Sequence, residues 1–426
     1  MEIYVVRPGD TLSGIAGMYN VSAERISATN GISPEESLVT GQTVVVLTPS
    51  VVHTVAPEET LEGIARLYGV STNRLYRNNI NLGGVPVIYP GQSIVISYDD
   101  VPDYTASAYG YAYTFADTSL LRATLPYNTY FVPFTYGITP SGALVDLNDA
   151  ALLTLAREYG SRPLMHLSTL TENGGFDSGL SDIILNNEVS RQNLIENVIS
   201  TIDEKGYVGL DIDFEYVPSR NAAAYAELVS DFRARLNSEG KIVIVALAPK
   251  TSAEQRGLLY EGHDYAALGA AADFVLLMTY EWGYTYGPPL AVAPIPNVRR
   301  VVEYALTEIS PQKIFLGIPN YGYDWPLPFV QGQSRAQSIS NVRAVEIARE
   351  AGVAIEYDEV SESPHFNYTA PDGTAHEVWF EDARSIDAKL SLIREYSLYG
   401  AGYWNLMRPF PQNWLVLNAR FNIRGR

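Results

Sequence analysis

Eight short apolar segments, separated by stretches with helical patterning, constrain the fold of this chain more than any other feature. One intervening stretch, 222–240, is amphipathic and ends at Gly240, a residue type typical of helix C-caps. Strands that alternate with helices predict an α/β fold, here a (β/α)₈ TIM barrel over residues 106–426. The expected strands are 107–115, 129–137, 163–169, 207–215, 241–249, 272–281, 313–322 and 399–406.

One interval between the expected strands is too long for a single helix. Residues 324–384 contain a helical pattern after Ser340 and then a β-rich stretch, 365–380. Asp372 and Gly373 separate two β runs in that stretch, and this dipeptide is typical of hairpin turns. We therefore expect a small α+β insertion over residues 324–384, after the seventh strand.

The first hundred residues contain an internal repeat. Residues 4–30 align with residues 53–79 at a constant offset. Each copy begins with a short β run, continues into a helix that starts after Thr11 or Thr60, and ends with a second helix and a closing β run. The repeat therefore predicts two βααβ modules. Their expected bounds are 2–48 and 51–98.

Composition excludes several classes of function. The chain has 426 residues and a net charge of -19, without a Lys/Arg cluster for phosphates, so we expect no nucleic-acid partner. No apolar run reaches the roughly 18 residues of a membrane span, so we expect no membrane insertion. There are no cysteines, and the histidines lack ligand spacing, so we expect no metal and no cofactor. The start, MEIYVVRPGD, lacks the pattern of a signal peptide.

The fourth expected strand carries three acidic residues at alternate positions. Asp211, Asp213 and Glu215 share one face of the segment VGLDIDFEYV, and the apolar residues between them share the other. The acidic face should point into the barrel, with Glu215 at the carboxyl end, where barrel enzymes hold their chemistry. Close carboxyls raise one another's pKa, which can yield an acid that donates a proton near neutral pH. Glycoside hydrolysis needs such an acid.

These residues resemble glycoside hydrolase family 18, whose fourth strand carries D-G-x-D-x-D-x-E. Val208 stands at the first Asp of that motif. The sixth-strand M-x-Y is present as Met278 to Tyr280, although Glu281 follows where the family has Asp. The seventh-strand G-x-P-x-Y-G is present at 317–322 and includes Asn320 and Tyr321, and Trp404 matches the tryptophan of the eighth strand. The third-strand S-x-G-G signature is absent.

The family resemblance implies a mechanism without a protein nucleophile. Glu215 would be the general acid/base, and the substrate's own N-acetyl oxygen would attack the anomeric carbon. Asp213 would orient the acetamide, and Tyr280 would donate a hydrogen bond to the acetamide oxygen. Asp211 would share a proton with Asp213, and Trp404 would stack under the sugar. The remaining motif residues implied to bind substrate are Met278, Glu281, Asn320 and Tyr321.

The two repeats resemble LysM modules, which implies binding of N-acetylglucosamine-containing glycans such as peptidoglycan or chitin. The loop that opens the first helix would contact the glycan. In the second copy, Glu58 and Glu59 replace the Gly-Asp pair of the first. A stabilising or spacer role is the alternative for both modules. The implied glycan-binding residues are Gly9, Asp10, Thr11, Leu12, Glu59, Thr60 and Leu61.

Tandem LysM modules before such a barrel resemble the spore cortex-lytic N-acetylglucosaminidases and related germination proteins of spore-forming bacteria. This resemblance implies peptidoglycan as the partner, in the form of cortex fragments, and a protein made in the mother cell and placed in the spore cortex or coat. Two alternatives stay open. One is a chitinase or another muropeptide-modifying enzyme on the same scaffold, and the other is a non-catalytic glycan-binding protein of the spore coat.

Overall fold

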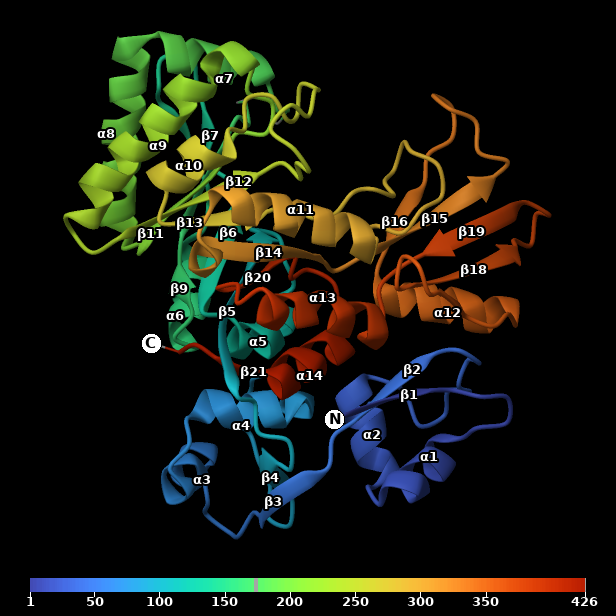
Figure 1. Cartoon of the computed structure of the whole chain (residues 1–426). Coiled ribbons are helices and arrows are strands. Elements are labelled where there is room, and N and C mark those ends of the chain that lie inside the picture. Colours follow the sequence, from blue (N-terminus) through green and yellow to red (C-terminus); the bar gives the residue numbers. More distant parts are fainter. Residues whose placement is uncertain (172–174, 426) are drawn as a thin grey trace.

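The computed structural model describes residues 1–171 and 175–425. A closed barrel of parallel strands forms the centre of the molecule, so the predicted (β/α)₈ fold is confirmed (Figure 1). Each strand pairs with its neighbour in parallel, and a bridge from Tyr136 to Leu167 closes the ring. The barrel strands are β5 (Tyr104–Tyr113), β6 (Tyr130–Phe134), β9 (Arg162–Pro163) continued by β10 (Met165–Ser168), β11 (Gly209–Asp213), β12 (Ile242–Leu247), β13 (Phe274–Leu277), β14 (Ile314–Pro319) and β20 (Gly400–Trp404).

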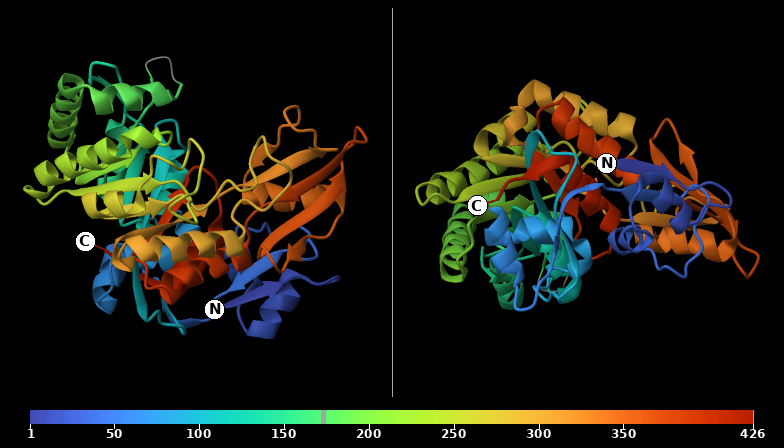
Figure 2. Two further views of the ribbon diagram at one scale, coloured as in Figure 1. Left: turned by 45° about the horizontal axis from the view of Figure 1, so that its top comes forward. Right: turned by 90° about the horizontal axis from the view of Figure 1, so that it is seen from below.

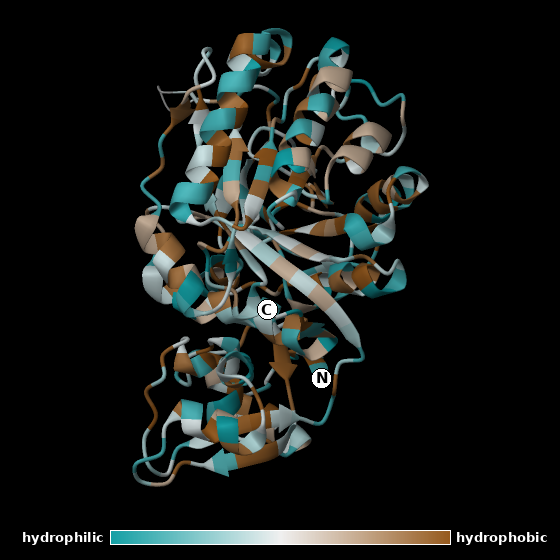
Figure 3. Ribbon diagram, turned by 90° about the vertical axis from the view of Figure 1, so that its left-hand side faces the viewer, coloured by the Kyte–Doolittle hydropathy of each residue, from teal (hydrophilic) through white to brown (hydrophobic). Residues whose placement is uncertain are grey.

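Helices cover the outside of the barrel, and apolar stripes alternate with polar ones along them (Figure 3). Helix α9 was predicted to end at Gly240 but ends at Asn237. Gly240 instead lies in the following turn at φ +72°, where its N–H donates to the Asn237 carbonyl at 3.0 Å. The helices are α5 (Thr118–Thr124), α6 (Ala150–Glu158), α7 (Ser178–Asn186), α8 (Glu188–Lys205), α9 (Ala222–Asn237), α10 (Tyr265–Ala271), α11 (Ile295–Glu308), α13 (Ala383–Glu395) and α14 (Pro411–Arg420).

Short elements complete the barrel domain. Strand β21 extends the edge of β5 after α14, and β7 and β8 form a two-residue ladder after β6. Their bounds are β7 (Gly137–Ile138), β8 (Leu144–Val145) and β21 (Phe421–Ile423). The barrel domain also contains short 3₁₀ helices, η2 (Leu125–Tyr127), η3 (Ser219–Asn221) and η4 (Pro311–Lys313). None of the helices in the described part of the chain is long and apolar enough to cross a membrane.

A separate antiparallel sheet with one helix follows β14 and projects to one side of the barrel, as predicted for the insertion (Figures 1 and 2). Its strands run in the order β16-β15-β19-β18-β17. The predicted hairpin turn is confirmed, because Gly373 has φ +88° between β18 and β19. The elements are β15 (Gly322–Leu327), β16 (Gln337–Ile339), α12 (Asn341–Ala351), β17 (Glu356–Asp358), β18 (Ser363–Thr369) and β19 (Ala375–Trp379).

Two small βααβ modules precede the barrel, as the repeat predicted. The Thr11 and Thr60 side chains cap the first helices, because each accepts a hydrogen bond from the backbone N–H three residues further along the chain. Ser22 and Ser71 cap the second helices in the same way. The first module contains β1 (Glu2–Val5), α1 (Leu12–Tyr19), α2 (Ala23–Asn30) and β2 (Thr43–Val46). The second contains β3 (Pro49–Thr54), α3 (Leu61–Tyr68), α4 (Thr72–Asn78), η1 (Ile80–Leu82) and β4 (Ser93–Tyr98).

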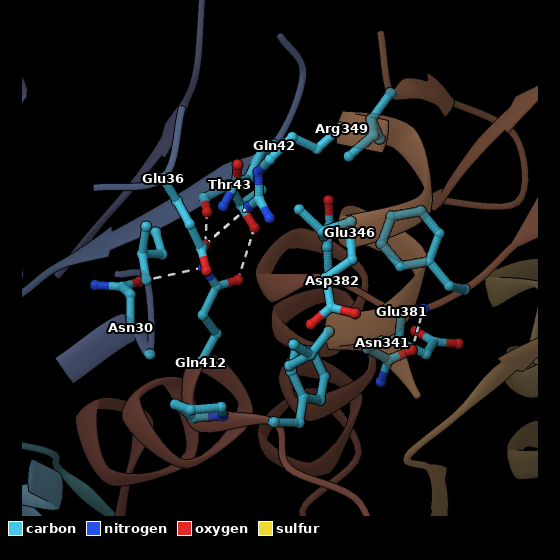
Figure 4. A pocket seen from close by; sticks show the side chains of 18 residues that line it. Asn30, Glu36, Gln42, Thr43, Asn341, Glu346, Arg349, Glu381, Asp382 and Gln412 are labelled. Carbon is cyan, nitrogen blue, oxygen red and sulfur yellow. Dashed lines mark hydrogen bonds and ion pairs between the residues drawn. The ribbon is translucent and has the colours of Figure 1, made fainter. Parts of the chain in front are cut away.

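The first module is docked on α14 and on the insertion (Figure 4). The Gln412 side chain reaches from α14 into the module, where its Nε2 donates to the Thr43 carbonyl at 2.7 Å and its Oε1 accepts from the Thr43 hydroxyl at 2.8 Å. From the insertion, Arg349 lies 3.1 Å from the Glu36 carboxylate. A cavity of about 60 Å³ remains at this seam. The module is therefore fixed to the barrel by polar contacts on two sides.

Candidate active site

The catalytic candidates converge on one cavity of about 650 Å³ at the carboxyl ends of the barrel strands. Asp213 reaches it from the end of β11 and Glu215 from the segment that follows. Met278, Tyr280 and Glu281 reach it from the segment after β13, and Trp404 from the end of β20. Strand β11 ends at Asp213, so the prediction that Glu215 lies within the strand was wrong. Glu215 lies two residues beyond the ladder, and its side chain still reaches the same cavity.

The acidic face of β11 points into the barrel, as its alternation predicted. Asp211 is fully buried below the cavity and is not among the lining residues, whereas the Asp213 side chain is 14% exposed. Leu210, Ile212 and Phe214 are fully buried on the other face. The strand therefore stacks carboxyls of decreasing burial toward the cavity.

Burial and mutual repulsion raise the pKa values of the stacked carboxyls. Burial raises the pKa of Asp211 to about 7. The pKa of Asp213 is raised well above its ordinary value by burial and by the charges of Glu215 and Asp211. The pKa of Glu215 is raised by burial and then by the charge of Glu281. Since charges this close cannot all form cheaply, Glu215 can hold a proton and donate it toward a bound ligand.

Glu281 is held in position by two tyrosines, Tyr321 in the segment between β14 and β15 and Tyr323 in β15. The Tyr321 hydroxyl donates to Glu281 Oε1 at 2.5 Å, and the Tyr323 hydroxyl donates to the same oxygen at 2.9 Å. Tyr321 therefore orients a cavity-lining carboxylate and does not itself line the cavity. The backbone of Glu281 has φ +67°, a left-handed conformation that costs free energy for a non-glycine residue.

Aromatic rings form one wall of the cavity. The Trp404 ring centroid lies 5.0 Å from that of Phe134 and 6.3 Å from that of Tyr113. These two rings also line the cavity and contact the tryptophan edge to face. A rigid aromatic face of this kind suits the apolar face of a sugar ring.

Asn320, another residue predicted to bind substrate, also lies outside the cavity lining. It is 3% exposed. Its Nδ2 donates to the Asn405 carbonyl at 2.8 Å and to the Arg408 carbonyl at 3.0 Å. The side chain therefore ties the end of β14 to the loop after Trp404.

His166 was not singled out from the sequence, yet it lies against the acidic strand. The register of β10 with β11 places His166 beside Asp211 and Ser168 beside Asp213. His166 is fully buried, and its Nε2 is 3.7 Å from Asp211 Oδ2 and 3.9 Å from Asp213 Oδ2. Its Nδ1 is 2.5 Å from the Thr135 hydroxyl. The alternation of Leu164, His166 and Ser168 was the available signal, because it predicts one inward face.

Burial lowers the pKa of His166 to about 3, so this side chain is neutral near pH 7. A neutral imidazole can accept or donate a hydrogen bond beside the two aspartates without adding charge to the barrel interior. The base of the acidic stack therefore has a polar neighbour, although no Lys or Arg of residues 1–171 and 175–425 forms an ion pair with Asp211 or Asp213.

The N-terminal modules share one loop design with different residues. In the first, Asp10 Oδ2 accepts from the Arg7 N–H at 2.7 Å and from the Tyr4 hydroxyl at 2.7 Å. At the positions offset by the repeat, Glu59 Oε2 accepts from the Ala56 N–H at 2.7 Å and lies 2.7 Å from His53 Nε2. The carboxylate of Glu59 thus reproduces the loop contact of Asp10.

The comparisons with known proteins agree with this geometry. The model of glycosyl hydrolases family 18 matches residues 161–408, and the LysM domain model matches residues 4–46 and 53–97. The chain belongs to glycoside hydrolase family 18 and carries two LysM domains. It is a glycoside hydrolase.

Similarity to individual relatives extends over the whole chain. The chain is 42% identical to the cortical fragment-lytic enzyme of Bacillus subtilis (strain 168), over 99% of each protein. The crystal structure of the Bacillus cereus spore cortex-lytic enzyme SleL superposes with a TM-score of 0.85 at 35% identity, covering 100% of this chain and 98% of that one. The corresponding enzyme from Bacillus megaterium QM B1551 gives 0.84 at 37% identity, covering 100% and 99%.

Proposed function

We propose that this protein hydrolyses the glycosidic bond that follows N-acetylglucosamine in peptidoglycan, and that its substrates are fragments of the spore cortex released during germination. The observation that carries this proposal is the convergence of Glu215, Asp213, Tyr280 and Trp404 on one cavity. The proposal for the substrate rests on the relatives above, whose names specify cortical fragments and the spore cortex.

The arrangement supports a reaction with retention of configuration. Glu215 donates its proton to the leaving glycosidic oxygen as the C1–O bond breaks. The substrate's own acetamide oxygen attacks C1 and forms a cyclic oxazolinium intermediate. The reaction therefore needs no protein nucleophile. Asp213 accepts a hydrogen bond from the acetamide N–H, and Tyr280 donates to its oxygen. Glu215 then removes a proton from water, and that water opens the intermediate.

The remaining predicted residues serve the same substrate in this proposal. Trp404 stacks against the sugar ring, Met278 packs against the acetamide methyl group, and Glu281 accepts a hydrogen bond from a sugar hydroxyl. Asp211 shares its proton with Asp213, so Asp213 can take the charge that it needs as the intermediate forms.

The two LysM modules hold the enzyme on its polymer in this proposal. Their helix-opening loops bind N-acetylglucosamine units, with Gly9, Asp10, Thr11 and Leu12 in one module and Glu59, Thr60 and Leu61 in the other. Because the enzyme and the cortex are both acidic, long-range charge does not attract them, and two tethered sites raise the local concentration instead. We place the protein in the spore, in the cortex or coat.

Product analysis tests the bond and the substrate together. The protein is incubated with purified cortex fragments and, separately, with chitin oligomers, and new reducing ends are reduced and identified by mass spectrometry. New N-acetylglucosamine reducing ends from the cortex fragments are expected. Products from chitin alone would identify a chitinase. Binding without cleavage of either substrate would contradict the proposed bond and substrate.

A further inference from the structure

The segment that carries Glu215 extends beyond the strand ladder that would otherwise fix it. The β11 ladder ends at Asp213, and residues 214–217 have no regular structure. A general acid needs a defined position, since a displacement of about 1 Å can lower a rate by about a hundredfold. Some contact outside the ladder must therefore fix this segment.

His263, from the loop before α10, makes that contact. Its Nε2 lies 3.0 Å from the Phe214 carbonyl and 3.1 Å from the Glu215 carbonyl. On the other side of the ring, the Ala248 N–H donates to Nδ1 at 3.0 Å. His263 is fully buried. The imidazole therefore bridges the segment that follows β11 to the segment that follows β12.

These contacts allow one protonation state of the ring. Nδ1 accepts from an N–H and so carries no proton, whereas Nε2 faces two carbonyl oxygens and so must donate. The ring is therefore neutral and in the Nε2–H form. Burial lowers the pKa of His263 to about 4, which agrees with this state.

The surroundings of His263 hold it rigidly against the segment. The Tyr225 ring lies 6.0 Å from the imidazole and stacks on the Phe214 ring at 5.6 Å. Gly262 approaches so closely that a Cβ there would lie 2.1 Å from the Val217 carbonyl oxygen. The Lys250 ammonium donates to the His263 carbonyl at 3.0 Å, and its charge also lowers the pKa of the ring.

We infer that His263 is a positioning residue for the general acid, which fixes the Glu215 backbone by donating to the Phe214 and Glu215 carbonyls. This inference rests on the proposed function for the role of Glu215. It assigns a catalytic purpose to a histidine that touches neither the cavity nor the substrate, and it explains how an acid outside the strand keeps one orientation.

Two amide variants separate positioning from simple packing. In His263→Gln, the side-chain amide can reach the two carbonyls in place of Nε2. In His263→Asn, the shorter side chain can accept from the Ala248 N–H but cannot reach the carbonyls. We expect His263→Asn to lower kcat on cortex fragments by about tenfold or more with little change in KM, and His263→Gln to stay within about threefold of the wild type.

The matched control is His365→Asn, the same substitution in the insertion, where the imidazole stacks on the Trp379 ring at 4.4 Å and does not line the cavity. It should leave kcat unchanged. Wild-type kcat in His263→Asn would overturn the inference. The inference would also be overturned if kcat fell equally in both amide variants and in proportion to their loss of thermal stability.

A measurement that needs no turnover keeps this test separate from the proposed function. The Glu215 carboxyl is titrated by ¹³C NMR, with its resonance assigned through its absence in Glu215→Gln. His263→Asn should shift the Glu215 pKa, whereas His263→Gln should not, and an unshifted pKa in both would overturn the inference. If neither variant folds, ¹⁵N NMR of the wild type decides: a proton on Nδ1 of His263 would contradict the contacts described.

Discussion

At the scale of single residues, the acidic strand carries a stability cost that the proposed mechanism uses. Asp211 is fully buried, and burial raises its pKa from an ordinary value of 3.8 to about 7. A carboxyl that resists ionisation destabilises the fold at pH values where the unfolded chain would ionise it freely. In the proposed mechanism, the same environment keeps a proton available beside Asp213 and Glu215.

The cost predicts a pH dependence of stability. The unfolded chain loses the Asp211 proton near pH 4, and the folded protein keeps it until about pH 7, so the folded state binds more protons between these values. The free energy of unfolding should therefore fall as pH rises through this window. Asp211→Asn cannot titrate, so the wild type should lose up to about 4 kcal/mol relative to this variant.

Chemical denaturation of both proteins at a series of pH values measures this difference. Comparison with the variant removes the contributions of titrating groups that do not interact with Asp211, whereas the pKa of Asp213 responds to the Asp211 charge. A difference between wild type and Asp211→Asn that stays constant from pH 4 to pH 8 would show that Asp211 ionises normally in the folded protein.

The sequence predicted the acidic residues at the cavity better than the histidines that contact them or their backbone. Alternation within one strand was sufficient to place Asp211 and Asp213 on one face, and Glu215, two residues beyond the strand, still reaches the same cavity as Asp213. His166 and His263 could not be assigned in the same way. The place of His166 depends on the register between neighbouring strands, and the role of His263 depends on a loop contact. The periodicity of a single strand predicts neither.

At the scale of single elements, the two LysM loops show how one conformation is reached with different residues. Gly9 has φ +86°, and Glu58 occupies the equivalent place at φ +69°. Sequence comparison indicated that the second copy lacks the Gly-Asp pair. It could not show that Glu58 adopts the same left-handed turn and that Glu59 makes the same contact with the backbone. The loop contact, and not the residue type, is retained.

This loop predicts a stabilising substitution. Glu58→Gly should raise the stability of the protein by about 1 kcal/mol, because glycine adopts this conformation without the Cβ penalty. Gly9→Ala, in the first module, should lower stability by a similar amount. Thermal unfolding of both variants beside the wild type measures these changes. Destabilisation by Glu58→Gly would mean that the Glu58 side chain contributes more than its backbone costs.

At the scale of the whole molecule, the LysM modules pack against the barrel domain and are not joined to it by a flexible linker alone. The second module contacts the barrel directly: the Tyr127 hydroxyl donates to the Arg77 carbonyl at 2.9 Å, and the Tyr159 hydroxyl donates to the Gly84 carbonyl at 2.8 Å. The sequence predicted the modules and the barrel separately, from local periodicity. It could not predict their docking, which depends on surfaces that are far apart in the chain.

Two adjacent glycines of the second module test this docking. Both have positive φ, but a Cβ on Gly84 would lie 2.0 Å from the Arg122 carbonyl oxygen, whereas a Cβ on Gly83 would meet nothing within 4 Å. Gly84→Ala should therefore destabilise the protein by about 1–3 kcal/mol more than Gly83→Ala, since it adds a steric clash to the same backbone strain. Equal losses of stability in the two variants would show that the module does not dock in this way.

The measurement that tests the account most directly compares turnover of cortex fragments by the wild type, Glu215→Gln and the control Glu204→Gln, whose side chain is on an exposed part of α8. The account predicts that Glu215→Gln lowers kcat by about a hundredfold or more while binding to cortex persists through the LysM modules, and that Glu204→Gln matches the wild type. Substantial turnover by Glu215→Gln would contradict the assignment of the general acid.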